Sequence, residues 1–71
     1  MAAKPPITNS IRDLRDQHGR MSQAELAKAI GVTRQTVIAI EQGRYSPSLE
    51  SAFRISRVFS AGIEDVFGWE G

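Results

Sequence analysis

The chain has 71 residues, which is one domain's length, and a domain of this size buries only about 60% of its unfolded surface. It has no cysteine, which excludes disulfides, cysteine–zinc sites and thiol catalysis, while 41% hydrophobic and 24% charged residues are typical of a folded globular protein. Residues 1–44 hold seven Lys and Arg against four Asp and Glu, a net +3, whereas residues 45–71 hold two against four, a net −2. This asymmetry favours a polyanion-binding face in the first part of the chain.

The start of the chain is expected to form a flexible arm over residues 1–7, followed by one domain over residues 8–71. The longest aliphatic run is four residues, whereas a membrane helix needs about 20. No apolar segment follows Lys4, so the sequence lacks the pattern of a secretory signal peptide. We therefore expect a cytoplasmic protein without membrane contact.

The pattern from Ser10 onward is helical, and no stretch alternates apolar and polar residues for long enough to predict a strand. Ser10 followed by Asp13 predicts the start of a first helix that ends at Gly19. Later caps and stops predict helices over Ser22 to Gly31 and Thr33 to Gly43, a fourth from Pro47-Ser48 and a fifth from Gly62.

The apolar positions supply a core for these helices. Leu26, Ala27 and Ile30 lie on the second helix, and Val37 and Ile40 share one side of the third. The fourth helix contains a helical stripe among Leu49, Ala52, Phe53, Ile55, Val58 and Phe59, and the short fifth carries Ile63, Val66 and Phe67. The sequence therefore predicts an all-α fold, a compact bundle of five short helices.

Residues 22–42 form a helix, a short glycine-containing turn and a second helix, the unit that places its second helix in the DNA major groove. The segment SQAELAKAIGVTRQTVIAIEQGRYSPSLE resembles the lambda-repressor/Cro-like helix-turn-helix family, also called the xenobiotic-response-element type. The resemblance extends from about Ile11 to Phe67. It implies a sequence-specific DNA-binding transcriptional regulator, a repressor associated with the nucleoid, whose partner is a two-fold operator in double-stranded DNA.

The third helix has a polar side that suits base reading. At about 100° per residue, Val37, Ile40 and Glu41 fall on one side, and Gln35, Ile38, Ala39 and Gln42 on the other. Arginine reads guanine and glutamine reads adenine with two hydrogen bonds, while aliphatic groups contact the thymine methyl. The alternative is a solvated face, against which Ile38 argues, because isoleucine gains little from facing only water. The expected base-reading residues are Arg34, Gln35, Ile38 and Ala39.

Phosphate contacts are expected around this helix. Gln23 begins the second helix, where free N–H groups and the helix dipole favour an anion. The alternative is that Gln23 and Thr33 only cap their helices. Capping uses a lone pair of the side-chain oxygen, however, and leaves the side-chain N–H or O–H free to donate to phosphate. The resemblance also implies an ion pair between Arg15 and Glu41 that joins the first and third helices. The resemblance implies that Thr33, Arg44, Tyr45 and Ser46 lie at the edge of the groove. The expected backbone-contacting residues are Gln23, Thr33, Gln42, Arg44, Tyr45 and Ser46.

The end of the chain is expected to make a homodimer, because a two-fold operator needs two recognition helices. One alternative is that the apolar residues at the end of the chain cover the protomer's own core. Another is that the fold serves an antitoxin-like protein-interaction module. His18 has no second histidine or cysteine with which to bind metal, and a chain this short hardly supplies a catalytic pocket. We therefore expect no enzyme activity, cofactor, metal or small-molecule ligand. The expected dimer contacts are Ile63, Val66, Phe67 and Trp69.

Overall fold

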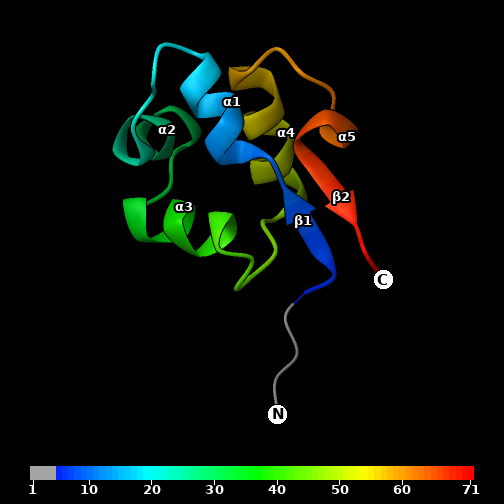
Figure 1. Ribbon diagram of the computed structural model, residues 1–71. Helices are drawn as coiled ribbons and strands as arrows, with labels where there is room; N and C mark the ends of the chain where they lie inside the picture. The colour runs from blue at the N-terminus through cyan, green and yellow to red at the C-terminus, as the bar shows by residue number, and fades with distance from the viewer. Residues whose placement is uncertain (1–4) are drawn as a thin grey trace.

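The computed structural model of the protein describes residues 5–71 (Figure 1). Residues 1–4 of the expected arm lie outside the described residues. The five expected helices are present, and a short antiparallel ribbon joins the two ends of the described chain. The elements in chain order are β1 (Ile7–Asn9), α1 (Ile11–Gln17), α2 (Gln23–Ile30), α3 (Arg34–Glu41), α4 (Leu49–Val58), α5 (Ile63–Val66) and β2 (Phe67–Trp69).

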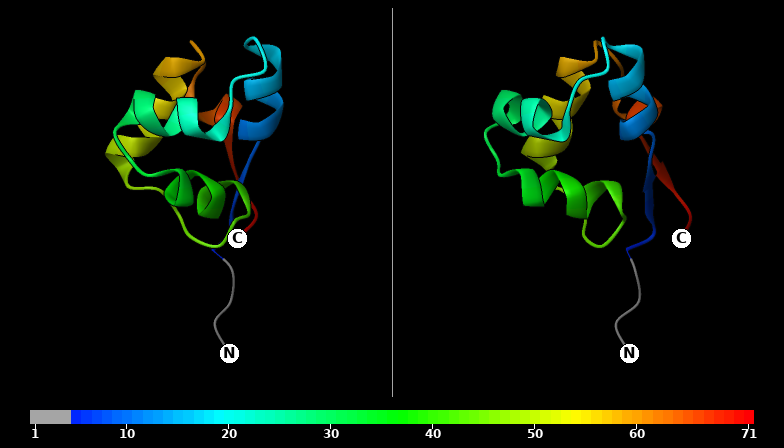
Figure 2. Two further views of the ribbon diagram at one scale, coloured as in Figure 1. Left: turned by 90° about the vertical axis from the view of Figure 1, so that its left-hand side faces the viewer. Right: turned by 60° about the vertical axis from the view of Figure 1, so that its left-hand side comes forward.

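The core lies between the helices, and every helix contributes to it. In both views of Figure 2, α3 lies along one side of the molecule, below α1, α2 and α4. Burying each large aliphatic side chain contributes roughly 1.5–3 kcal/mol to folding. The buried cluster consists of Ile11, Leu26, Ala27, Ile30, Val37, Ile40, Ile55, Phe59 and Val66.

The apolar stripe of α4 is narrower than its sequence suggests. Ala52, Ile55 and the helix-ending Phe59 are buried, whereas Leu49 is 72% and Phe53 54% exposed. Helical periodicity gives the spacing of apolar side chains but not the width of the surface that other elements cover. Two large hydrophobic side chains of α4 are therefore left at the protein surface.

Hydroxyl caps begin the three helices that follow α1. The caps accept a hydrogen bond from the backbone N–H three residues on, at 3.0 Å for Ser22, 3.2 Å for Thr33 and 3.1 Å for Ser48. In each case the cap residue is extended, with ψ near 160°, which directs its hydroxyl back over the first turn. These three predicted helix starts are confirmed.

The predicted cap at Ser10 is wrong, although α1 does begin at Ile11. Ser10 has ψ 26° instead of the extended value, and its hydroxyl makes no capping bond. The Asn9 side-chain oxygen instead accepts the N–H of Ile11 at 3.1 Å. The backbone N–H of Ser10 donates to the carbonyl of Val66 at 2.8 Å, so its conformation follows the terminal ribbon.

The expectation of a chain without strands is also wrong. Strands β1 and β2 pair antiparallel, and Glu70 N–H extends the ladder by donating to the Pro6 carbonyl at 2.7 Å. Each strand has only three residues and its partner lies at the other end of the chain, so periodicity carries no signal for it. The register is Ile7 opposite Trp69, Thr8 opposite Gly68 and Asn9 opposite Phe67.

The ribbon changes the expected ends of two segments. Ile7 lies in β1 and not in the arm, and Phe67 begins β2 instead of continuing the fifth helix. A Cβ at position 68 would lie 2.5 Å from the Thr8 hydroxyl, so any larger residue there would require the Thr8 side chain to shift. Within residues 5–71, no helix is long and apolar enough to span a membrane.

The capping box of α2 makes the stability of the protein depend on pH. The Glu25 carboxylate accepts the backbone N–H of Ser22 at 2.9 Å, and this bond, followed by the Ser22 hydroxyl, lowers the pKa of Glu25. A carboxyl with a lowered pKa stabilises the fold above its unfolded-state pKa and loses that effect as the pH falls through its folded-state pKa.

We therefore expect Glu25→Ala to lower the urea midpoint of unfolding at pH 7 and to have a smaller effect at about pH 3, because protonation of the folded-state carboxyl removes its hydrogen bonds to Ser22. Glu70→Ala, an exposed acidic residue outside the helices, is the matched control. An equal loss at both pH values would contradict this role of the carboxylate.

Candidate nucleic-acid interface

The joint between α2 and α3 is three residues long and is fixed by local geometry. Gly31 ends α2 with φ +76°, a left-handed conformation that favours glycine, and Thr33 then caps α3. The N–H of Val32 donates to the carbonyl of Ala27 at 3.0 Å. Both helices place their apolar side chains in the same buried cluster, so the joint holds them as one helix-turn-helix unit.

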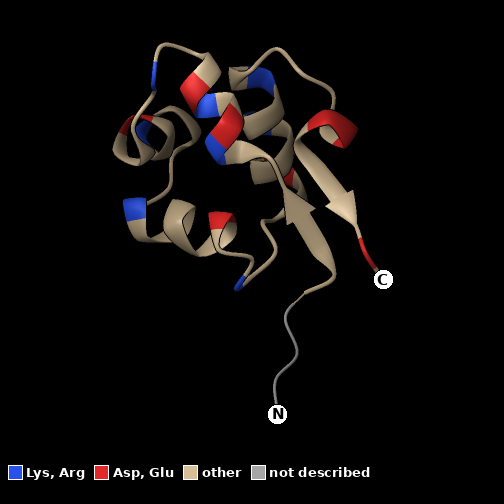
Figure 3. Cartoon of the chain, viewed as in Figure 1, with Lys and Arg blue, Asp and Glu red and all other residues tan. Residues whose placement is uncertain are grey.

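The first turn of α3 presents its polar side chains to the exterior. Arg34 and Gln35 are exposed, whereas Ile38 and Ala39 in the next turn are half-buried. The first turn contains no acidic residue. Figure 3 shows basic residues at the start of α3 and in the loop after it, and acidic residues on α5 and after β2. The charge of the surface around α3 therefore suits an anionic partner.

The side of α3 that faces α1 is held by a largely buried ion pair. Arg15 binds the Glu41 carboxylate with two hydrogen bonds, Nε–Oε2 at 2.7 Å and Nη2–Oε1 at 3.0 Å, and the two side chains are 11% and 8% exposed. The Glu41 hydrogen bond raises the pKa of Arg15. Arg15 also donates to the Met21 carbonyl at 2.8 Å, and Gln23 donates to Glu41 at 3.2 Å. This network ties α1, the start of α2 and α3 together.

The side-chain amide of Gln23 is thus already bound to Glu41, although Gln23 was expected to contact phosphate. Gln23 also lines a polar hollow of about 600 Å³ between α1, the start of α2 and α3. Arg12 and Arg34 also line this hollow. Arg12 was not among the residues predicted to contact DNA. Its spacing of three from Arg15 places both on one face of α1, which was the available signal.

The other expected backbone contacts lie at or after the ends of α3. Thr33 Oγ1 accepts the Thr36 N–H and lies 3.0 Å from the Thr36 hydroxyl. Gln42, which ends α3, is exposed. In the following loop Arg44 and Tyr45 are exposed and Ser46 is half-buried. These groups lie at the two ends of α3, where the backbone of a bound duplex would pass.

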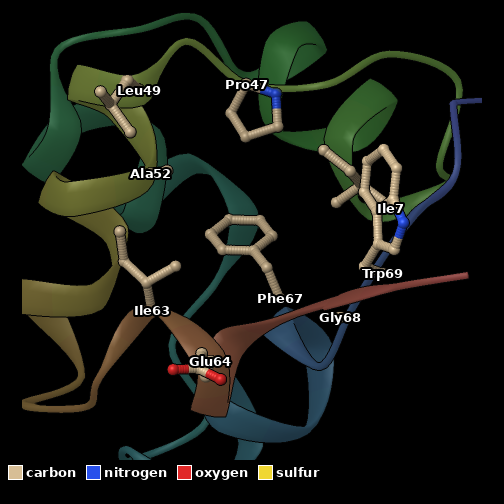
Figure 4. Close-up of a pocket in the computed structure, with 9 residues that line it drawn as sticks. All are labelled: Ile7, Pro47, Leu49, Ala52, Ile63, Glu64, Phe67, Gly68 and Trp69. Carbon is tan, nitrogen blue, oxygen red and sulfur yellow. The ribbon is translucent and has the colours of Figure 1, made fainter. Parts of the chain in front are cut away.

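The expected dimer contacts separate into two sets. Val66 is 1% exposed and belongs to the protomer's own core, so it is not available to a partner. Ile63, Phe67 and Trp69 line an apolar groove of about 560 Å³, with the Phe67 ring in its centre (Figure 4). Trp69 is 71% exposed. The remaining groove residues are Ile7, Pro47, Leu49, Ala52, Glu64 and Gly68.

We expect Glu41→Ala to cost about 3 kcal/mol or more in the free energy of unfolding, because it leaves the buried Arg15 guanidinium without its partner. Glu50→Ala is the matched control: it breaks the Arg54–Glu50 pair (2.6 Å), whose side chains are 54% and 73% exposed, and should cost under about 1 kcal/mol. Urea unfolding measures both, and equal small losses would show that burial of the Arg15–Glu41 pair is energetically unimportant.

A family model described as helix-turn-helix matches residues 11–66. An HTH-type transcriptional regulator of Methanocaldococcus jannaschii is 48% identical over 64 residues, 90% of this chain and 96% of the relative. The regulator YgzD of Bacillus subtilis is 50% identical over 64 residues, with the same coverage of 90% and 96%. The transcriptional repressor RstR of the cryptic phage CTXphi in Vibrio cholerae is 34% identical over 60 residues, 84% of this chain and 53% of the repressor. The chain therefore belongs to the lambda-repressor/Cro-like helix-turn-helix family of DNA-binding transcriptional regulators.

Proposed function

We propose that the protein is a transcriptional repressor that inserts α3 into the major groove of a two-fold operator, and that it acts at the nucleoid in the cytoplasm. The observation that carries the proposal is the polarity of α3: its first turn is exposed, basic and free of acid, while its last turn is bound to the bundle through Glu41. Such a helix can enter a groove without losing its own anchor. Similarity to a phage transcriptional repressor supports repression as the mode of action.

Base reading belongs to the exposed side of α3. Arg34 reads a guanine through O6 and N7, and Gln35 reads an adenine through N6 and N7. Ile38 and Ala39, half-buried in the second turn, contact thymine methyl groups. Each bidentate contact of this kind discriminates against a wrong base by roughly 1–3 kcal/mol.

Phosphate binding surrounds the reading helix. The start of α2 supplies free backbone N–H groups beside Gln23, and Arg12 lines the same hollow. Thr33 at one end of α3, and Gln42, Arg44, Tyr45 and Ser46 at the other, contact the backbone on the two sides of the groove. These contacts position the helix without reading sequence.

The protein acts as a homodimer in which a second copy covers the apolar groove of Ile63, Phe67 and Trp69. A two-fold operator needs two copies of α3 separated by about 34–36 Å. The groove is lined by α4, α5, both strands of the ribbon and Pro47 of the loop between α3 and α4, and no residue of α3 lines it, so α3 stays free for DNA. A tryptophan that is 71% exposed at the edge of an apolar groove suits a self-complementary contact.

The same groove supports the second candidate, a protein-interaction module of the antitoxin kind, in which a different protein occupies it. The two candidates differ in oligomeric state. A protein that is monomeric both alone and on DNA, at concentrations where it binds selected duplex, would contradict the homodimer and favour the second candidate.

We expect Trp69→Ala to weaken the homodimer at least about tenfold, as loss of an interface tryptophan does. Phe53→Ala is the matched control, since Phe53 is 54% exposed on α4 but does not line the groove. Sedimentation equilibrium measures both variants. Equal dissociation constants for Trp69→Ala and wild type would place the dimer contact elsewhere.

We expect Arg34→Ala to lower affinity for the preferred duplex by roughly 1–3 kcal/mol and to relax preference at one base pair. Gln35→Ala should behave in the same way at a neighbouring position, with adenine as its partner. Arg44→Ala should weaken all sequences about equally and reduce the slope of log affinity against log salt by about one.

Binding of each variant to duplexes with single-base changes, at two salt concentrations, separates these roles. The preferred duplex comes from selection among random sequences. A uniform loss for Arg34→Ala, with its base preferences intact, would assign Arg34 to phosphate binding instead.

A further inference from the structure

The side chain of Asn9, the last residue of β1, reaches the far end of α3. Its Nδ2 donates to the carbonyl of Ile40 at 3.0 Å and lies 3.4 Å from the carbonyl of Glu41, while its Oδ1 accepts the N–H of Ile11. The backbone of Asn9 pairs with Phe67 in the ribbon. One side chain therefore joins the last turn of α3, the first turn of α1 and the terminal ribbon.

Both ends of this amide make hydrogen bonds. The last carbonyls of a helix lack partners within it and carry the negative end of its dipole. The Ile40 carbonyl accepts the Gly43 N–H at 3.0 Å, and the Asn9 amide donates to the same oxygen as a second partner. The first N–H groups of α1 require an acceptor. Asparagine supplies both within one short side chain, whereas aspartate at position 9 would keep the acceptor for Ile11 and set a negative charge against the carbonyls of α3.

We propose that Asn9 is a positioning residue for DNA reading: it fixes the main chain of the last turn of α3 and thereby the direction in which the helix enters the groove. This inference rests on the proposed function. It differs from the role of Arg15, which binds the side chain of Glu41 and leaves the helix main chain unbound.

A small change of direction at the last turn of α3, where Asn9 binds, displaces the first turn, where Arg34 and Gln35 lie. Arg34 precedes Ile40 by six residues, about 9 Å along the helix axis. A tilt of about 10° at the last turn moves the first turn by roughly 1.5 Å, which exceeds the tolerance of about 0.5 Å for a binding constellation. Loss of the Asn9 hydrogen bonds should therefore displace Arg34 and Gln35.

The test compares Asn9→Asp with Val58→Ala. Asn9→Asp is nearly isosteric and keeps the acceptor for Ile11, while Val58 packs against the core from α4 and so controls for a general loss of stability. Asn9→Ala, which removes both hydrogen bonds without adding charge, is the second variant if aspartate prevents folding. Binding is measured at a temperature where each protein is folded, on the preferred duplex and on duplexes with single-base changes.

We expect Asn9→Asp to lower affinity for the preferred duplex about tenfold, the order of one lost bidentate contact, and to compress the affinity ratio between preferred and altered duplexes. The backbone amide resonances of residues 34–42 should shift in the free protein. Val58→Ala should keep the affinity ratio, and the resonances of residues 34–42, close to those of wild type.

Two results would overturn the inference, and they are distinguishable. If the Asn9 variants keep the wild-type affinity ratio as Val58→Ala does, Asn9 only stabilises the fold. If the wild-type protein itself fails to distinguish any duplex from random DNA, the proposed function falls first and the role of Asn9 falls with it.

Discussion

The buried ion pair between Arg15 and Glu41 determines which side of α3 is available to a partner. A buried pair is a weak source of net stability, but an unpaired buried charge is costly, so α3 cannot turn about its axis without a large penalty. Gln23 and the Met21 carbonyl complete the network, which ties the start of α2 to the same carboxylate. The direction of Gln35 thus follows from an interaction on another side of the helix, whereas Arg34, seven residues before Glu41, lies on the same side as the ion pair and lines the hollow beside it.

The two ends of α3 consequently have different roles. The last turn is bound through its Glu41 side chain and, by way of Asn9, through its main-chain carbonyls. The first turn is capped by Thr33 and otherwise exposed, which suits side chains that reach into a groove. The apolar groove around Phe67 is lined by α4, α5, the ribbon and Pro47 of the loop after α3, and by no residue of α3 itself.

Local chemistry made much of this structure predictable from sequence. Ser22, Thr33 and Ser48 each set a helix start through a bond three residues away, and the spacing of apolar residues located the core. The predictions that were wrong depend on non-local pairing. The ribbon pairs the two ends of the described chain, so Ile7 belongs to β1 and not to the arm, and Phe67 belongs to β2 and not to the fifth helix. The exposure of Leu49 and Phe53, the burial of Val66 and the hydrogen bonds of Asn9 to α3 likewise depend on elements distant in sequence.

The most direct test of the central claim is a nuclear magnetic resonance titration of the protein with its selected duplex. If the outer side of α3 reads DNA, the side-chain resonances of Arg34, Gln35 and Ile38 should change most. The Arg15 guanidinium resonance should persist, since the pair with Glu41 is kept in the complex. The largest changes at Trp69 and Leu49, with Arg34 and Gln35 unaffected, would contradict the assignment of α3 as the reading helix.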